Sequence, residues 1–309
     1  MKTLILHHDD CLRHDPGARH AESPARITAV MNGIRNLPGT ELLPAPLATE
    51  AQLELAHAAD YWKRLLELEP HKKDPQSRIA LDADTFLSPG SLDATLRSSG
   101  AACFAVDQVF EGRAKNAFCA TRPPGHHANS TTAMGFCLLN QAAVAARHAQ
   151  QSQGAGRVAI LDFDVHHGNG TQDIFEDSPD VLYISSHQIP LYPGSGYPEE
   201  TGCGNILNLP LAPGSGSTEF RRIWSDHGLK ALEVFSPDLV IISAGFDAHI
   251  ADPLAQLELV DEDYGWITSE ICSFAGANCG SRVVSVLEGG YDLNALSSAS
   301  AAHVAALAG

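Results

Sequence analysis

The stretch from Val158 to Gln172, VAILDFDVHHGNGTQ, concentrates side-chain types that bind metals. Its first four residues, Val158 to Leu161, form an apolar run typical of a strand buried on both faces of a parallel sheet. Side chains alternate faces along a strand, so Asp162, Asp164 and His166 share one side if the extended geometry continues. Buried charges usually have to be paired or to bind a metal. The pattern therefore favours a metal site over a polar loop that merely ends a strand.

Three other predicted strands also end in polar residues interspersed with glycine. Residues 116–120 lead into RPPGHH, residues 239–243 into AGFDAHIADP, and residues 282–287 into EGGYD. In open α/β sheets the ligand crevice lies outside the carboxyl ends of the strands. The polar clusters are therefore expected to converge on one site.

Asp164, His166 and Asp247 would supply one nitrogen and two carboxylates to a metal. A catalytic zinc site takes about three protein ligands and keeps one position open for water. From the residues alone, Asp247 could instead be a helix N-cap, and His166 a core histidine hydrogen-bonded to backbone.

The tandem His126-His127 follows Pro123-Pro124-Gly125, which restricts the backbone tightly. Adjacent imidazoles on a rigid loop suit a general base and a general acid, because imidazole titrates near neutrality. Tyr291 has glycines beside it that let a loop turn inward. Its phenol could donate to a developing oxyanion or could be a buried structural tyrosine.

The elements that must position these residues alternate between strand and helix. We expect strands at 3–6, 116–120, 158–161, 181–185, 206–209, 239–243 and 282–287. We expect helices from residue 24 to about 38, then at 51–68, 91–110, 140–151, 220–235 and 263–277, and over the alanine-rich tail; residues 71–85 are predicted to form a charged surface loop. This alternation predicts an α/β fold with a mainly parallel sheet and helices on both faces. Without repeats or a low-complexity linker, residues 1–309 are predicted to form a single domain.

Composition limits the classes of partner. Of 309 residues, 44% are hydrophobic and 18% charged, as in ordinary globular proteins, and the formal net charge is −17. Such acidity argues against nucleic acid or anionic membranes as partners, while it is compatible with a cationic substrate. No apolar run reaches the length of a membrane span, and the amino terminus lacks signal-peptide features. Seven scattered cysteines without a C-x-x-C pair predict a reduced, cytoplasmic protein. The oligomeric state is not predicted.

The motifs RPPGHHA, GFCLLN, LDFDVHHGNGTQDIF, SAGFDAHIADPL and LEGGYDL together resemble the histone deacetylase family. This family includes class II-like deacetylases, bacterial deacetylase-like amidohydrolases, acetylpolyamine amidohydrolases and acetoin-utilisation proteins. HAESPARI also resembles the family's early H-P-E-x-P-x-R segment, with Ala21 where proline is usual. The likeness runs from about His20 to the end and implies the arginase/deacetylase-like α/β fold.

The resemblance also implies roles for individual residues. It makes Asp164, His166 and Asp247 the ligands of one zinc ion, and it leaves His167 without a ligand role. His126 and His127 fall on the catalytic histidine pair, and Tyr291 falls on the tyrosine that polarises the acyl carbonyl.

Further positions follow from the same resemblance. Asp162 falls on the carboxylate that orients His126 and, with Ser185 and backbone carbonyls, helps to bind a structural potassium or sodium ion. Asn169 falls on the partner of His127, where another branch has aspartate, which favours a class II-like assignment. The remaining matches are Gly135 and Phe136 in the acyl-lysine tunnel, Tyr192 as its opposite wall, and Arg26 in the channel that releases acetate.

The implied reaction is metal-assisted hydrolysis of an acyl-lysine amide in a peptide or protein. Leu254 matches a rim position where polyamine-selective relatives carry glutamate, so acyl-lysine is favoured over an acetylated small amine. Two further hypotheses are a catalytically silent protein that binds acylated partners, and an arginase-type hydrolase with two metal ions.

Overall fold

The computed structural model describes residues 1–71 and 74–309, whose eight longer strands form one continuous sheet. The strands are Thr3–His7 (β1), Thr40–Pro44 (β2), Asn116–Cys119 (β5), Val158–Asp162 (β6), Val181–Gln188 (β7), Ile206–Leu211 (β8), Leu239–Ala244 (β9) and Val283–Leu287 (β10). Their order is β2-β1-β5-β10-β9-β6-β7-β8, and every neighbouring pair is parallel. Two short strands, Ile79–Ala80 (β3) and Phe86–Leu87 (β4), form a separate antiparallel pair.

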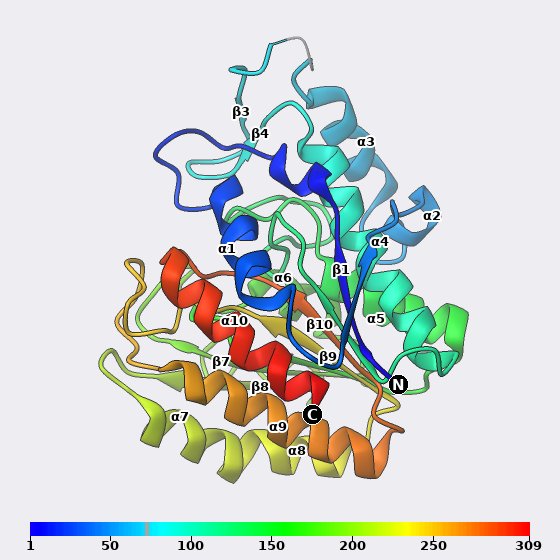
Figure 1. Cartoon of the computed structure of the whole chain (residues 1–309), viewed down its shortest axis with the longest axis vertical. Coiled ribbons are helices and arrows are strands. Elements are labelled where there is room, and N and C mark those ends of the chain that lie inside the picture. The colour runs from blue at the N-terminus through cyan, green and yellow to red at the C-terminus, as the bar shows by residue number, and fades with distance from the viewer. Residues whose placement is uncertain (72–73) are drawn as a thin grey trace.

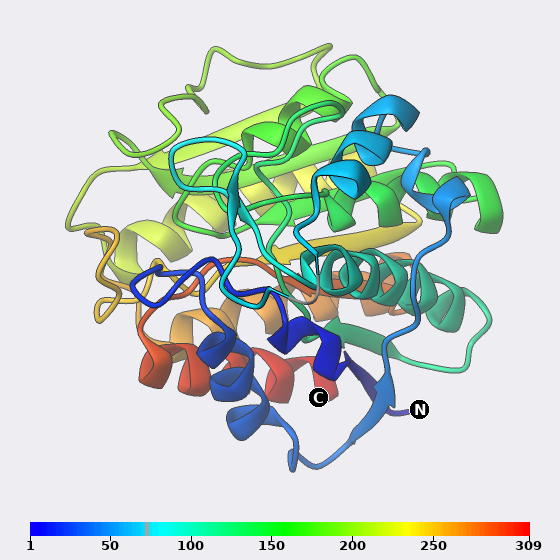
Figure 2. The ribbon, with the colours of Figure 1, turned by 90° about the horizontal axis from the view of Figure 1, so that it is seen from above.

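Helices cover both faces of this sheet (Figures 1 and 2). The helices of the described residues are Pro24–Ile34 (α1), Glu50–Leu53 (α2), Ala59–Leu68 (α3), Ser91–Phe110 (α4), Gln141–Gln153 (α5), Asn169–Phe175 (α6), Ser217–Ile223 (α7), Leu229–Phe235 (α8), Asp261–Asn278 (α9) and Leu293–Ala308 (α10). A π-helical turn, Trp224–Gly228, joins α7 to α8, and a 3₁₀ turn covers Asp9–Leu12. This architecture confirms the predicted α/β class with a parallel sheet.

Alternation along the strands builds two cores. In β9, Val240 and Ile242 pack with α1 and α7 to α10, whereas Leu239 and Ile241 pack with α4 and α5. Because both faces are covered, the central strands are apolar at consecutive positions, and this is why they could be predicted. None of the described helices has the length and apolar character needed to cross a bilayer.

The region around α2 and α3 differs from the prediction of one helix over 51–68, which was wrong. The side chains of Thr49 and Gln52 cap α2 at its start, and the chain leaves the helix after Leu53. The intervening segment is held by tertiary hydrogen bonds, because the imidazole Nε2 of His57 accepts the N–H of Asn140 at 2.8 Å.

The strands β2, β3 and β4 and the helix α6 were also not predicted. β2 is an edge strand whose side chains are mostly exposed, so it carries no apolar pattern, and α6 is only seven residues long. The predicted surface loop at 71–85 contains β3, while Lys72 and Lys73 lie outside the described residues.

Candidate metal and catalytic centre

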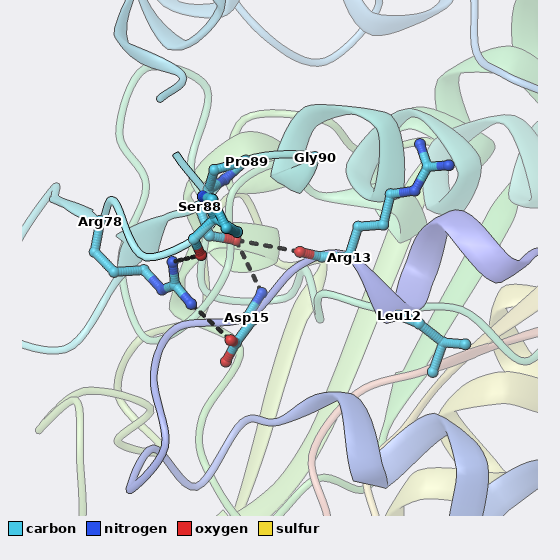
Figure 3. Close-up of a pocket in the computed structure, with 8 residues that line it drawn as sticks. Leu12, Arg13, Asp15, Arg78, Ser88, Pro89 and Gly90 are labelled. Atoms are coloured by element: carbon cyan, nitrogen blue, oxygen red, sulfur yellow. Dashed lines mark hydrogen bonds and ion pairs between the residues drawn. The ribbon is translucent and has the colours of Figure 1, made fainter. Parts of the chain in front are cut away.

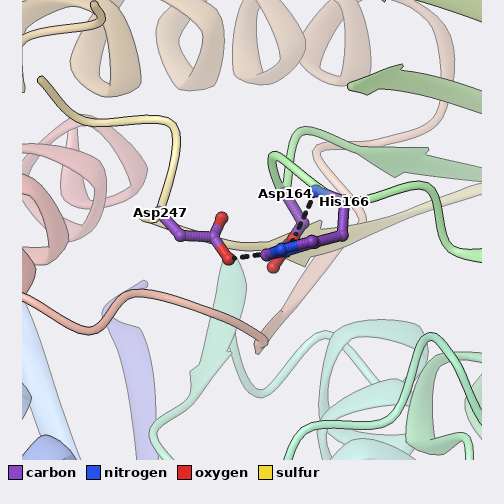
Figure 4. Close-up of side chains that lie close together, drawn as sticks. All are labelled: Asp164, His166 and Asp247. Carbon is purple, nitrogen blue, oxygen red and sulfur yellow. Dashed lines mark hydrogen bonds and ion pairs between the residues drawn. The ribbon is translucent and has the colours of Figure 1, made fainter. Parts of the chain in front are cut away.

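The strand order brings three metal-binding side chains together. Asp164 and His166 follow β6, Asp247 follows β9, and these strands are neighbours in the sheet. One ligand atom from each residue lies within 4.8 Å of the others. His166 Nδ1 lies 3.1 Å from Asp164 Oδ1 and 3.1 Å from Asp247 Oδ2. Figure 4 shows the three side chains pointing toward one another. Two carboxylates and one imidazole thus face a common point.

An N-cap role for Asp247 and a backbone-bonded core role for His166 do not fit the structure. Asp247 starts no helix, since α9 begins at Asp261; its Oδ1 instead accepts the N–H of Val165 at 2.9 Å. His166 directs Nδ1 at the two carboxylates rather than at a backbone carbonyl.

The electrostatics of this cluster favour a bound cation. Burial, together with the nearby charge of Asp164, raises the pKa of Asp247 to about 7. Burial alone would lower the pKa of His166, but hydrogen bonds to Asp164 and Asp247 raise it to about 10. Two buried carboxylates with oxygens within 4.8 Å of each other repel unless a positive charge lies between them. The donor set, one imidazole and two carboxylates, fits a catalytic zinc ion with an open position.

Two glycines leave room for the carboxylates. A Cβ atom on Gly245 would lie 2.1 Å from Asp164 Oδ2, and one on Gly289 would lie 2.1 Å from Asp247 Oδ2. Gly289 also donates its N–H to Asp164 Oδ2 at 2.8 Å. Any larger side chain at either position would therefore clash with these carboxylates.

The loop after β5 carries His126 and His127, whose ring centroids lie 4.1 Å apart. His126 Nδ1 lies 3.0 Å from Asp162 Oδ2, and His127 Nδ1 lies 2.8 Å from Asn169 Oδ1. An amide oxygen only accepts hydrogen bonds, so Nδ1 of His127 carries a proton. In the neutral ring, Nε2 is therefore the nitrogen that can accept another proton.

Neighbouring charges shift the pKa values of the two histidines in opposite directions. Burial opposes protonation of His126, yet the carboxylates of Asp164 and Asp162 raise its pKa well above the usual value. Burial and the adjacent His126 and His166 hold the pKa of His127 well below the usual value. His126 thus favours the cationic form and His127 the neutral form, which is the division expected of a charge-holding group and a general base.

A cavity of about 220 Å³ opens onto this cluster. Its lining residues are Asp84, His127, Gly135, Phe136, His166, Leu191, Tyr192, Leu254 and Tyr291. The rings of Phe136 and Tyr291 meet edge to face at 5.8 Å, and Tyr192 meets His127 at 5.1 Å. All four residues predicted for the tunnel and rim therefore line one cavity. Leu191 was not predicted to line it, nor was Asp84, which lies in the predicted surface loop.

Arg26 is fully buried beside Tyr291, which lines the cavity. Its guanidinium donates to the carbonyls of Gly290 at 2.6 Å and Glu288 at 2.5 Å, and its Cζ lies 4.9 Å from the ring centroid of Tyr291. It also pairs with the buried Glu22 at 3.2 Å. These contacts support the loop of Tyr291, while the acetate-release role of Arg26 stays a prediction.

Two other predicted positions lie at the edge of the cluster. His167 directs Nδ1 to Ser195 Oγ at 2.8 Å and Nε2 to Gln172 Oε1 at 3.0 Å, so both of its nitrogens have partners other than a metal ligand. Ser185 lies beside Asp162 in the β6–β7 register, and its Oγ lies 2.8 Å from His187 Nδ1.

A second cavity, of about 430 Å³, shares no lining residue with the first. Figure 3 shows the residues that line it. It is lined by Leu12, Arg13, Asp15, Pro75, Arg78, Ser88, Pro89 and Gly90. Arg78 pairs with Asp15 at 2.6 Å, and Arg13 lies 3.2 Å from Asp10. The charged residues among the described lining, Arg13, Asp15 and Arg78, therefore pair within the protein.

Comparisons with known proteins agree with this geometry. A family model described as "Histone deacetylase domain" matches residues 20–307. A "Probable deacetylase" of Archaeoglobus fulgidus is 37% identical over 320 residues, covering 100% of this chain and 87% of the relative. A "Histone deacetylase-like amidohydrolase" of Pseudomonas aeruginosa is 38% identical over 283 residues, covering 89% and 73%. The crystal structure of the HDA15 HD domain superimposes with a TM-score of 0.92 at 34% identity, covering 99% of this chain and 88% of that one.

Proposed function

Because the chain belongs to the histone deacetylase family and shares its arginase/deacetylase-like fold, we propose that it is a zinc-dependent deacylase of N-acyl-lysine side chains in peptides or proteins. Family membership makes it a hydrolase that deacetylates amides; the metal, the residue roles and the acyl-lysine substrate are the proposal. The observation that carries it is the Asp164, His166 and Asp247 cluster beside a cavity that His127 and Tyr291 also line. We propose that residues 1–309 form one catalytic domain.

Asp164, His166 and Asp247 would hold the zinc ion. When bound, zinc supplies a Lewis acid that polarises the acyl carbonyl and lowers the pKa of water toward about 7. The rest of the mechanism comes from side chains of this protein.

His127 is the proposed general base. Its Nε2 accepts a proton from the attacking water, because Asn169 fixes the other ring nitrogen as a donor. The imidazolium that results is a strong acid, since its surroundings hold the pKa of His127 low, and it returns the proton to the leaving amine. His126, braced by Asp162, holds the neighbouring positive charge and the geometry of the pair.

Tyr291 is the proposed donor to the acyl oxygen. Burial raises the pKa of its phenol well above the usual value, so the hydroxyl stays protonated. It can therefore donate a hydrogen bond that strengthens as negative charge develops on that oxygen.

The cavity walls support an acyl-lysine substrate. Phe136, Leu191, Tyr192 and Leu254 offer apolar surface suited to the methylene stem of lysine. Among the described lining residues Asp84 is the one acid, and Leu254 offers no charge to a second ammonium group. An acetylated polyamine or other small amine is the second candidate, favoured by the net charge of −17, which would attract any cation.

We also propose a structural potassium or sodium ion at Asp162 and Ser185. Both side chains are buried oxygen donors on adjacent strands, and a monovalent cation there would offset the cost of burying the Asp162 carboxylate. A cytoplasmic location is proposed from the seven cysteines, all of which are free thiols.

A substrate panel tests the proposal. Zinc-reconstituted protein is assayed with acetyl-lysine peptides, peptides of longer acyl chains and N-acetylputrescine, with a hydroxamate inhibitor as control. We expect kcat/KM for the best peptide to exceed that for acetylputrescine by at least ~10-fold. A reversed order would favour the small-amine function, and zinc-loaded protein inactive on every amide would favour a catalytically silent binding protein.

A further inference from the structure

Glu288 is a buried carboxylate for which the mechanism above has no role. We propose that Glu288 is a positioning residue that holds the loop of His126 and His127 against the loops of Tyr291 and Asp247. The inference rests on the proposed deacylase function and concerns how the loops of that site are held in their relative positions.

The side chain of Glu288 contacts the loop after β5 on one side of its strand and strand β9 on the other. Its Oε2 accepts the backbone N–H groups of Gly125 at 2.6 Å and His126 at 3.1 Å. Its Oε1 accepts from Ser243 Oγ at 3.2 Å, near the end of β9 and four residues before Asp247. One carboxylate thus connects the histidine loop to the strand that leads to a proposed metal ligand.

The order of the strands explains why Glu288 can contact both the histidine loop and β9. β10, which Glu288 follows directly, lies between β5 and β9. The loop after β5 carries the two histidines, and the loop after β9 carries Asp247. A side chain at the carboxyl end of the middle strand is therefore the natural bridge between them.

The backbone of Glu288 is itself fixed. Its N–H donates to the carbonyl of Ala244 at 2.9 Å, and its carbonyl accepts from Arg26. Tyr291 follows three residues later, and Arg26 also holds the carbonyl of Gly290. The Glu288 side chain therefore extends from a fixed backbone position, and the length of the side chain determines where the histidine loop lies.

The histidine loop packs closely against Leu139 and Gln141 in the observed arrangement. A Cβ atom on Gly125 would lie 2.0 Å from Gln141 Oε1 and 2.7 Å from the carbonyl of Leu139. Without the Glu288 carboxylate, the N–H of His126 would be buried without an acceptor in this arrangement. The N–H of Gly125 would keep only the side-chain oxygen of Gln141, at 3.3 Å, in place of its 2.6 Å bond to Glu288. The loop would then shift to pair them, and the His127 imidazole would shift with it.

Two substitutions of Glu288 distinguish the effect of its side-chain length from the effect of its charge. In Glu288→Gln the amide oxygen can accept both N–H groups while the amide nitrogen donates to Ser243, so the bridge survives without the charge. In Glu288→Asp the charge is kept, but the side chain is one methylene too short to contact both the histidine loop and Ser243. The matched control is Asp263→Ala. Asp263 is another buried carboxylate, which accepts from Ser217 and Arg221 between α9 and α7.

We expect Glu288→Asp to lose on the order of 100-fold in kcat, with KM nearly unchanged and one zinc per chain, because a shift of about 1 Å misplaces the base. Glu288→Gln should lose less than about tenfold, and the Asp263→Ala control should lose stability while keeping kcat. Crystal structures of the zinc-loaded variants should keep the 3.0 Å contact of His126 Nδ1 with Asp162 Oδ2 in Glu288→Gln and lose it in Glu288→Asp.

Equal or better turnover of Glu288→Asp relative to Glu288→Gln would overturn the inference, as would undisturbed histidines in the Glu288→Asp crystal structure. If the wild-type protein hydrolyses no amide, the proposed function fails, and the crystal structures still decide whether Glu288 positions the histidines.

Discussion

Replacement of Gly135 by alanine should displace the His127 imidazole. Gly135 has φ +55°, and a Cβ atom there would lie 2.5 Å from Cδ2, 2.8 Å from Cγ and 3.1 Å from Cβ of His127. Carbon atoms in favourable contact lie roughly 3.5–4.0 Å apart. The added methyl group therefore forces the ring to move by about 1 Å, and a misplacement of that size costs on the order of 100-fold in rate.

Gly154→Ala is the matched control. Gly154 has φ +69° at the end of α5, and a Cβ atom there would meet no heavy atom within 4 Å. Both variants place an L-residue in the left-handed region, which costs roughly 1–2 kcal/mol. Both should lose the stability that this conformation costs an L-residue, and Gly135→Ala should lose more because of its clash with His127. Only Gly135→Ala should lose kcat.

The assay is steady-state hydrolysis of an acetyl-lysine peptide by zinc-loaded protein, with urea unfolding for stability. If Gly135→Ala retains kcat within about threefold of Gly154→Ala, His127 need not occupy its observed position and the reasoning is refuted.

Three further predictions follow from the same geometry. Tyr291→Phe should keep its zinc but lower kcat by roughly two orders of magnitude, since an oxyanion donor is lost; near-normal turnover would remove Tyr291 from the mechanism. Leu254→Glu should raise kcat/KM for acetylputrescine relative to an acetyl-lysine peptide by about tenfold, because a carboxylate at the rim attracts the free ammonium; an unchanged ratio would show that the rim does not select. Burial lowers the pKa of His57 from 6.5 to about 4, and its Nε2 must be unprotonated to accept the Asn140 N–H. Because the folded-state pKa lies below the unfolded value, this stability is present above pH 6.5 and is lost as the pH falls toward 4, by up to about 3 kcal/mol. Urea unfolding at pH 5 and pH 7 should show a smaller difference for His57→Gln than for the wild type, and equal differences would contradict the assignment.

The central fold could be predicted because its signals are local. A strand buried on both faces is apolar at consecutive positions, as Val158 to Leu161 are, and the polar residues that follow mark its carboxyl end. The edge strand β2 is exposed and carries no such signal. The break between α2 and α3 depends on the hydrogen bond of His57 to Asn140, 83 residues away, which no local pattern reveals.

The residues of the site also fall into those that local sequence patterns predict and those that depend on distant contacts. Asp164, His166 and Asp247 could be proposed as a group because each follows a predicted strand of one sheet. Glu288 belongs to the EGGYD cluster that was expected at the site, but its contacts could not be predicted, because its partners at Gly125 and His126 are backbone groups more than 160 residues away. Asp84 was missed because its place in the cavity depends on how the loop before β4 packs, where Thr85 Oγ1 accepts the N–H of Phe136 at 3.1 Å.

The most direct test of the proposed function is a zinc titration of chelator-treated protein, with hydrolysis of an acetyl-lysine peptide as the readout. Activity should be absent without metal, rise in proportion to added zinc and saturate at one zinc per chain, while Asp247→Ala should stay inactive at the same zinc concentrations. Saturation at two metal ions per chain, or full activity in the chelated protein, would contradict the single-zinc deacylase.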